Sequence, residues 1–207
     1  MAATLPERGA GLPALLRDPR LWRGSAAAAI AAEPTGYAAL DRALPGGGWP
    51  CGALSEILHA RPGVGEISLA LPLLARLSAA GRPVALVGPP FIPYAPALAA
   101  AGIDLVHLRV VQAQGDDALW VCEQLLQARA GAVLAWAGRL DLQTLRRLQL
   151  GAETGGGIAL LYRSGRWAQE VSPAALRLQV WRARGVAQVQ VLKCRGAQPQ
   201  QRFALAQ

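Results

Sequence analysis

The chain is poor in lysine, histidine and cysteine, and each shortage excludes a class of chemistry. Lys193 is the single lysine among 207 residues, so no lysine upstream of it can hold a nucleotide phosphate. His59 and His107 are the two histidines, and neither has serine-triad or metal-ligand spacing around it. The three cysteines are far apart in sequence, which fits neither a metal site nor a disulfide framework. We therefore expect no catalytic residues, no metal ion and no cofactor.

Long hydrophobic runs are also missing. No apolar run approaches the roughly 18 residues that a membrane span needs. The first residues, MAATLPERGAG, carry an acid and lack the apolar centre of an export signal. We therefore expect a cytoplasmic protein without membrane contact. Hydrophobic residues make up 53% of the chain and charged residues 16%, which predicts a substantial core.

Basic charge is concentrated in the last third of the chain. Residues 1–138 hold ten arginines and ten acidic residues, which cancel. Residues 139–207 hold eleven basic and three acidic residues, and these account for the whole net charge of +8. A one-sided basic segment favours a polyanionic partner such as nucleic acid, whereas a solvated basic face is the alternative interpretation.

Short apolar runs alternate with amphipathic segments through the middle of the chain. Runs rich in Val, Leu and Ile predict strands at residues 53–59, 83–87, 105–111, 132–137 and 157–162. The segments between them predict helices at residues 66–79, 95–101, 116–129 and 142–153. Strands buried on both faces and joined by helices form a mainly parallel sheet between two helical layers. The predicted fold class is therefore a three-layer α/β domain.

The two ends of the chain have a different character. Residues 176–184 and 186–193 alternate apolar and polar side chains around Gly185, which predicts an antiparallel hairpin, and residues 201–205 are a candidate last strand. Residues 11–23 predict a short amphipathic helix, followed by an alanine-rich linker. We divide the chain into an N-terminal helical arm and linker, residues 1–33, and a core, residues 34–207. The arm packs either on its own core or on a neighbouring molecule.

Residues 56–69, EILHARPGVGEISL, have the frame of a phosphate-binding loop. A strand, a Pro/Gly loop and a helix follow one another, and such a loop cradles phosphate with backbone N–H groups. It also needs a lysine for the phosphates and a hydroxyl for magnesium, but Gly65 is followed by Glu66 and Ile67. Gly63 and Gly65 still offer N–H groups. Weak nucleotide binding without turnover and a glycine turn kept for folding are both compatible with this pattern.

The order of motifs over residues 34–207 resembles the RecA core. TGYAALDRALPGGGWPCGALSEIL is similar to its first helix, glycine turn and strand, GIALLYR to its sensing strand, and VQVLKCRGAQPQQRFAL to its closing hairpin. Within that superfamily, GGGWPCGALSEIL, RPGVGE and PPFIPYAPALAAAGIDL resemble the ImuA family of accessory proteins in SOS-induced, error-prone translesion DNA synthesis. The related SulA family, whose members inhibit cell division by binding FtsZ, is the alternative.

This resemblance implies a RecA-like fold whose phosphate loop is degenerate. It places Glu66 at the phosphate-loop lysine and Ile67 at the magnesium hydroxyl. Pro90 falls near the catalytic glutamate, and residues 136–138 replace the end of the strand that carries a magnesium-orienting aspartate. Because three parts of phosphoryl-transfer chemistry are missing together, we expect no ATPase activity.

The resemblance also implies partners and surfaces. The partners are ImuB, which is a Y-family-like protein, an error-prone replicative-type polymerase, and DNA, bound weakly and without sequence preference. DNA-holding loops correspond to residues 138–143 and 163–173, and basic residues follow on the next helix and the hairpin. The candidate DNA contacts are Arg139, Arg146, Arg147, Arg163, Arg166, Trp167, Lys193 and Arg195. The candidates for docking on ImuB or for self-association are Leu15, Leu16 and Trp22 of the arm.

Overall fold

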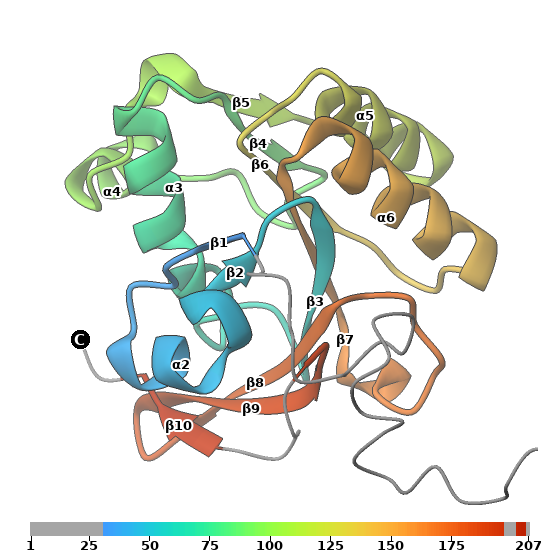
Figure 1. Cartoon of the computed structure of the whole chain (residues 1–207). Coiled ribbons are helices and arrows are strands. Elements are labelled where there is room, and N and C mark those ends of the chain that lie inside the picture. The colour runs from blue at the N-terminus through green and yellow to red at the C-terminus, as the bar shows by residue number, and fades with distance from the viewer. Residues whose placement is uncertain (1–30, 197–201, 206–207) are drawn as a thin grey trace, which may run out of the picture.

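A computed structural model describes residues 31–196 and 202–205, in which a mixed sheet lies between two pairs of helices (Figure 1). Within these residues the sheet has eight strands, in the order β10-β9-β8-β3-β7-β6-β4-β5. The parallel strands are β3 (Ala53–His59), β4 (Val84–Val87), β5 (Leu108–Val111), β6 (Ala132–Trp136), β7 (Ile158–Ser164) and β8 (Leu176–Ala183). Antiparallel pairing adds β9 (Val186–Cys194) and β10 (Arg202–Ala204) at the β8 edge. The predicted α/β class, the mainly parallel central sheet and the C-terminal antiparallel hairpin are confirmed.

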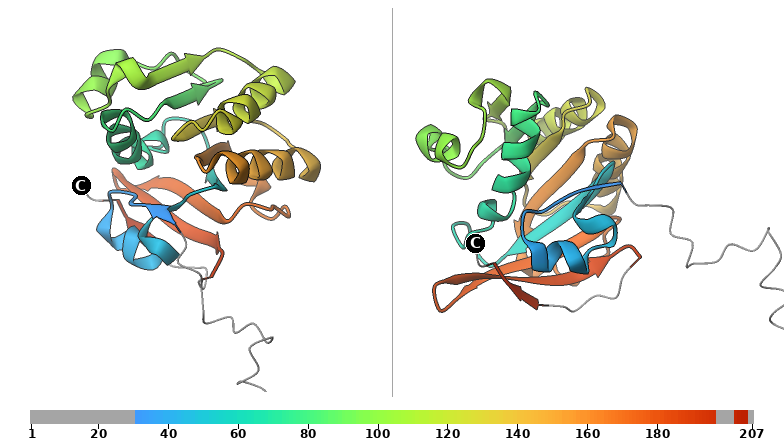
Figure 2. Two further views of the ribbon diagram at one scale, coloured as in Figure 1. Left: turned by 45° about the horizontal axis from the view of Figure 1, so that its top comes forward. Right: turned by 60° about the vertical axis from the view of Figure 1, so that its left-hand side comes forward.

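Helices cover both faces of this sheet, as the turned views in Figure 2 show. One face carries α3 (Leu71–Ala79) and α4 (Ala95–Ala100), and the other carries α5 (Gly115–Gln127) and α6 (Leu142–Gly155). Side chains alternate across a buried strand, so Ile57 of β3 joins the core beneath α3 while Leu54 joins the core beneath α5 and α6. Two apolar cores, one on each face of the sheet, therefore hold the three layers together.

Short elements brace the beginning of β3. They are β1 (Ala32–Glu33), α2 (Ala38–Ala43), the 3-10 turn η1 (Pro45–Gly47) and β2 (Trp49–Pro50). β1 pairs with β2 in antiparallel fashion, and the Asp41 carboxylate of α2 accepts the Thr35 N–H at 2.7 Å. Trp49 of β2 is fully buried, so the chain enters β3 through a packed and hydrogen-bonded segment.

The predicted helix over residues 66–79 is interrupted in the structure. A 3-10 turn, η2 (Ile67–Leu69), precedes α3, which begins at Leu71 with Pro72 in its first turn. Proline has no N–H to donate, so the carbonyl of Ser68 receives no α-helical hydrogen bond from residue 72. It accepts a backbone N–H at the end of η2 and also the Tyr37 hydroxyl, the latter at 3.1 Å.

Two predicted strands also differ at their ends. The first residues of the 105–111 segment form a 3-10 turn, η3 (Leu105–His107), because the Asp104 carboxylate accepts the Val106 N–H at 2.9 Å. His107 lies in this turn, with Nδ1 2.9 Å from the Asp104 carboxylate, and the expectation that it lies within a strand is wrong. β7 continues two residues beyond the predicted end at Tyr162.

No helix in the described ranges is long and apolar enough to cross a bilayer. The predicted arm helix, with Leu15, Leu16 and Trp22, falls within residues 1–30 and lies outside the described residues.

Candidate functional site

The loop after β3 is closed by one of its own side chains. Glu66 is buried, and its carboxylate accepts the Gly63 N–H at 2.9 Å through Oε1 and at 3.1 Å through Oε2. Gly63 and Gly65 have φ of 85° and 96°, a region that favours glycine, so the chain can turn back over the carboxylate. The expectation that the Gly63 N–H remains available to a phosphate is wrong, because an internal anion already takes it.

A cavity of about 450 Å³, the apolar cleft, lies beside this closed loop. Its lining includes Ile67 and Pro90, which the resemblance places at the magnesium hydroxyl and near the catalytic glutamate. Trp136 lines it as well and stacks on buried Tyr162, with ring centroids 4.7 Å apart and planes 12° from parallel. Burial, with Glu66 nearby, raises the pKa of Tyr162, so the phenol stays neutral. At the magnesium-hydroxyl and glutamate positions the wall is apolar, although Glu66 and Ser68 also line the cleft.

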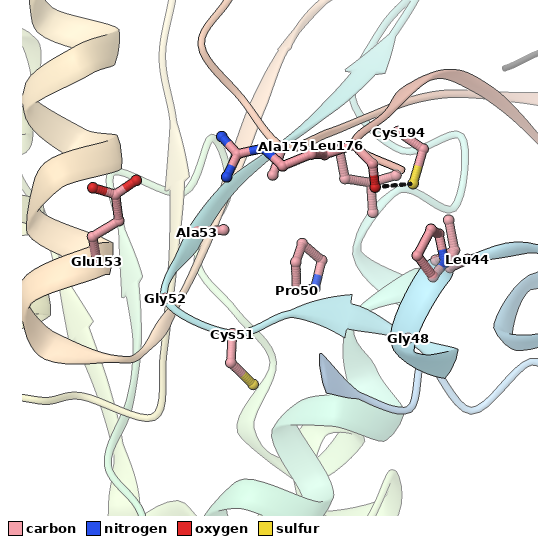
Figure 3. Close-up of a pocket in the computed structure, with 12 residues that line it drawn as sticks. Leu44, Gly48, Pro50, Cys51, Gly52, Ala53, Glu153, Ala175, Leu176 and Cys194 are labelled. Carbon is pink, nitrogen blue, oxygen red and sulfur yellow. Dashed lines mark hydrogen bonds between the residues drawn. The ribbon is translucent and has the colours of Figure 1, made fainter. Parts of the chain in front are cut away.

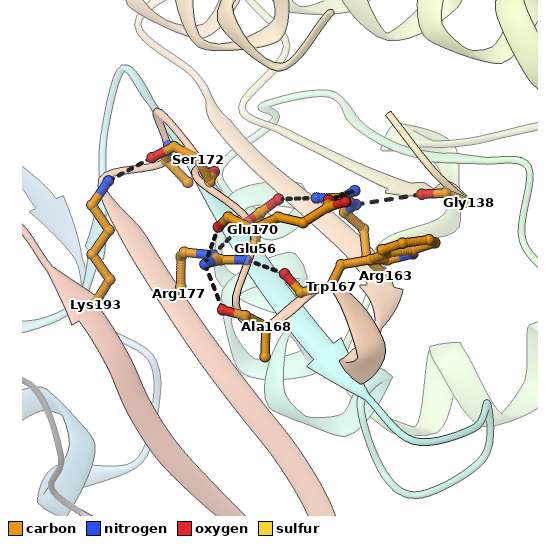
Figure 4. A network of polar contacts seen from close by, with 10 residues as sticks. Glu56, Gly138, Arg163, Trp167, Ala168, Glu170, Ser172, Arg177 and Lys193 are labelled. Atoms are coloured by element: carbon orange, nitrogen blue, oxygen red, sulfur yellow. Dashed lines mark hydrogen bonds and ion pairs between the residues drawn. The ribbon is translucent and has the colours of Figure 1, made fainter. Parts of the chain in front are cut away.

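A buried group of charges joins three neighbouring strands (Figure 4). Glu56, in the middle of β3, lies opposite Arg177 of β8 in the parallel register, and the two are 2.5 Å apart between Oε2 and Nε. Arg163 of β7 reaches the other carboxylate oxygen, with 2.7 Å between Nη1 and Oε1. The side chains of Glu56 and Arg163 are fully buried and that of Arg177 is nearly so. One carboxylate therefore compensates two arginines in the interior.

The same guanidinium groups anchor the connection between β7 and β8, which includes the 3-10 turn η4 (Gly165–Trp167). Arg177 donates to the carbonyls of Trp167, Ala168 and Glu170 at 2.9, 3.0 and 3.0 Å. Arg163 reaches the Glu170 carboxylate at 3.3 Å and donates to the Gly138 carbonyl at 3.4 Å, which ties in the loop after β6 (Figure 4). We call the buried group of Glu56, Arg163 and Arg177 the loop anchor.

Arg163 is the clearest correction to the predicted DNA contacts. It is 1% exposed, and its guanidinium bonds to Glu56, Glu170 and the Gly138 carbonyl inside the protein, so it is not available to a phosphate backbone. Glu56 is the residue that sequence reasoning missed. A charged side chain within a strand buried on both faces needs a partner, and that signal was present in ALSEILH.

The other predicted DNA contacts fall into separate groups. Arg139 is exposed and borders a hollow with Glu170, so the structure does bring the two predicted loops together. Arg166 is exposed with its guanidinium 4.7 Å from the Trp167 ring centroid, an arrangement typical of a cation–π pair. Figure 4 shows that Lys193 lies across the loop anchor from Gly138.

The remaining candidates are partly engaged within the protein. Arg146 and Arg147 lie on α6, and Arg147 pairs with Glu123 of α5 at 2.7 Å. Lys193 donates from Nζ to the Ser172 carbonyl at 2.7 Å, and partial burial lowers the pKa of Lys193. Arg195 is exposed at the end of β9. The predicted DNA contacts are therefore spread over α6, the end of β9 and the loops after β6 and β7.

A smaller cavity, of about 170 Å³, lies where β3 and β8 begin, at the other end of these strands from the apolar cleft (Figure 3). Cys51, Cys194 and Glu153 line it. Burial raises the pKa of both thiols, so neither cysteine is activated as a thiolate. No cluster of three metal-binding side chains occurs in the part of the chain that the structure describes.

Comparisons with known proteins give one family. No curated protein matches this chain. Among solved structures, SulA from Pseudomonas aeruginosa is similar, at 24% identity over 54% of this chain and 98% of that chain, with a TM-score of 0.45. The model of the MT3502 N-terminal domain matches residues 42–169, from the end of α2 into the connection between β7 and β8. Because this match spans more than half of the sequence, the chain belongs to the MT3502 N-terminal domain family.

Proposed function

We propose that this protein is a non-catalytic, RecA-like accessory protein of SOS-induced, error-prone translesion DNA synthesis, of the ImuA kind. In this role it bridges polymerase partners and touches DNA weakly. The observation that carries the proposal is the Glu66 carboxylate on the Gly63 N–H, inside the frame of a phosphate loop. A frame that keeps its strand, loop and helix but holds its own anion fits a scaffold better than an enzyme.

Electrostatics supports the absence of nucleotide turnover. A buried carboxylate beside a triphosphate is a like-charge contact, and its repulsion grows in a low-dielectric site. The Gly63 N–H would have to leave Glu66 before it could bind phosphate. Ile67 and Pro90 supply no magnesium ligand or general base in the adjoining cleft. We therefore propose that the protein neither hydrolyses ATP nor binds it at micromolar concentration.

Equilibrium binding with fluorescent ATP tests this part of the proposal. We expect no saturable binding with or without magnesium. Micromolar, magnesium-dependent affinity would overturn the scaffold model. Glu66→Gln serves as a matched variant, because the amide keeps the shape and removes the anion. Binding that appears in Glu66→Gln alone would show that the carboxylate is what excludes the nucleotide.

The DNA contact in this proposal rests on Arg139, Arg166 and Trp167. Arginine with a stacked aromatic ring supports backbone contact and base stacking without sequence preference. We expect Arg139→Ala with Arg166→Ala to weaken single-strand binding and to reduce the salt slope by about 0.7 for each phosphate that the variant no longer neutralises. Arg42→Ala removes an exposed charge from α2, away from these loops, and should leave the slope unchanged. Equal effects of the two changes would reject the loops as the DNA site.

Partner choice separates this proposal from its alternative. Purified full-length protein is immobilised and offered purified ImuB, and, in a parallel arm, purified FtsZ. The proposed function predicts retention of ImuB and loss of FtsZ in the wash. Retention of FtsZ alone would replace it with a SulA-type role in cell division.

A further inference from the structure

Large apolar side chains project into solvent along one wall of the apolar cleft. Phe91, Ile92 and Tyr94 are 70%, 89% and 71% exposed, and they lie within four residues between β4 and α4. Single exposed hydrophobic residues are ordinary, but a contiguous group beside a cavity marks an interaction site. Ile67 and Trp136 continue the apolar surface across the cleft.

The backbone of this wall is constrained before any partner arrives. Pro90 and Pro93 fix their own φ angles, and Gly88 has φ of 60° with its N–H donated to the Val111 carbonyl at 2.9 Å. At the other end, the Tyr94 carbonyl accepts the Ala97 N–H at 3.0 Å, at the start of α4. A segment held in this way loses little entropy on binding, so its exposed rings are suited to act as anchors.

The exposed charges around the cleft are basic. Among the described residues that line it, Arg182 is the single base and is exposed, whereas Glu66, the single acid, is buried. The loop touches the hairpin at this point, since a Cβ on Gly65 would lie 3.4 Å from the Ala187 Cβ. Arg184, at the hairpin tip, and the loop residue Arg61 are both exposed and lie on the two segments that meet here. The charges exposed to a partner at the cleft are therefore basic, while its one acid is buried.

We propose that the apolar cleft binds a segment of a partner protein that carries large apolar anchors flanked by acidic residues. The anchors pack against Phe91, Tyr94 and Trp136, and the acidic flanks face Arg182 and its neighbours. The cleft is thus the protein-docking surface of the scaffold, and this assignment rests on the proposed function only for the identity of the partner.

Charge complementarity argues against the chain's own arm as the occupant. Residues 11–23 contain three arginines and one aspartate, so the arm is basic and would meet a basic rim. The Glu66 carboxylate repels a nucleotide phosphate. A sugar-phosphate backbone also offers no apolar surface on which the three exposed side chains could pack. An acidic, apolar polypeptide matches both the rim and the wall.

Fluorescence anisotropy with full-length protein and three labelled probe peptides tests this assignment. The first peptide has about 15 residues, with Leu and Phe at i, i+4 and i+7 and with Asp and Glu elsewhere, since such spacing places anchors on one helical face. The second replaces each acid with lysine, and the third is residues 9–24 of this chain. We expect the acidic peptide to bind at least about tenfold more tightly than the other two.

Substitutions at the wall and rim give the matching signature. Phe91→Ala with Tyr94→Ala should weaken the acidic peptide about tenfold or more, because buried aromatic anchors dominate such interfaces. Arg182→Glu should weaken the acidic peptide and strengthen the lysine peptide. Val106→Ala and Trp120→Ala, exposed apolar residues elsewhere on the surface, are the controls and should change neither. Unchanged thermal melts confirm that the exposed-residue variants remain folded.

Three results would overturn the assignment. They are equal binding of the acidic and lysine peptides, tightest binding of the arm peptide, and no effect of the Phe91 and Tyr94 changes. The binding experiment with purified ImuB keeps the two proposals separate. If the double variant retains ImuB as well as the wild type does, the cleft assignment fails and the proposed function stands. If ImuB never binds but the acidic peptide does, the cleft assignment stands and the proposed function fails.

Discussion

Replacing Glu56 with glutamine should remove a large fraction of the protein's stability. The amide preserves the volume of the side chain but leaves Arg163 and Arg177, both buried, without the carboxylate that compensates them. Glu170 still faces Arg163, at 3.3 Å, but its side chain is 36% exposed and compensates weakly. Breaking a buried ion pair by removing one partner costs about 3–5 kcal/mol.

This loss is large against a total unfolding free energy of about 5–15 kcal/mol. For a chain of this size, 1 kcal/mol shifts the melting temperature by about 2–4 °C, so Glu56→Gln should lower it by roughly 6–20 °C. Urea unfolding followed by circular dichroism and tryptophan fluorescence measures the free energy directly. Both probes should report the same transition if the protein unfolds as one unit.

Glu33→Gln provides a control with the same chemical change. Glu33 pairs with Arg82 at 2.7 Å, but the two side chains are 26% and 42% exposed. Solvent screens such a pair, and its loss should cost no more than about 1 kcal/mol. If Glu56→Gln destabilises the protein no more than Glu33→Gln does, the buried group is not holding the three strands together and the reasoning fails.

Three further predictions concern single sites. Burial raises the pKa of Cys122 to about 12. A thiol reagent at pH 8 should therefore modify Cys51 and Cys194 first and reach Cys122 only when the protein unfolds. Early labelling of Cys122 would contradict its burial. The Asp141 carboxylate accepts a backbone N–H at the start of α6, which lowers its pKa. Its stabilising effect is therefore present above the unfolded pKa of about 3.9 and is lost as pH falls through the lower folded value, so Asp141→Ala should flatten the acid limb of a stability–pH curve. Gly88→Ala should destabilise the fold by at least about 1–2 kcal/mol in urea titrations, because φ is 60° and a Cβ would lie 2.6 Å from a backbone carbonyl; wild-type stability would refute the predicted strain.

The sequence was informative wherever local pattern decides structure. β3 spans the predicted residues 53–59, and the hairpin turns at Gly185, where φ is 79°. Period-two alternation and a glycine between two strands are local signals, so no tertiary contact was needed to find them. Residue identity also showed that Glu66 and not a lysine follows Gly65, and with the resemblance to RecA this is the basis for proposing a scaffold rather than an enzyme.

The partners of buried charges were beyond the reach of the sequence. Arg163 was assigned to DNA because the resemblance to RecA places a DNA-holding loop at residues 163–173, whereas the structure shows it bound to Glu56, 107 residues away in the chain. Long-range pairing of this kind depends on strand order, and a single sequence does not give that order. The apolar cleft was missed for a related reason, since its walls come from the β3–α3 and β4–α4 connections and from the ends of β6 and β8.

The sequence by itself determined the layered α/β domain and its antiparallel end, because these follow from side-chain periodicity. Tertiary structure alone decided which charges remain on the surface. Arg163 and Arg177 are buried and pair with Glu56, because a buried charge needs a partner. Arg139 and Arg166 are exposed, and water solvates their charges. The closure of the loop is a local contact, since Glu66 lies three residues from Gly63, but only the structure shows that its carboxylate accepts the Gly63 N–H.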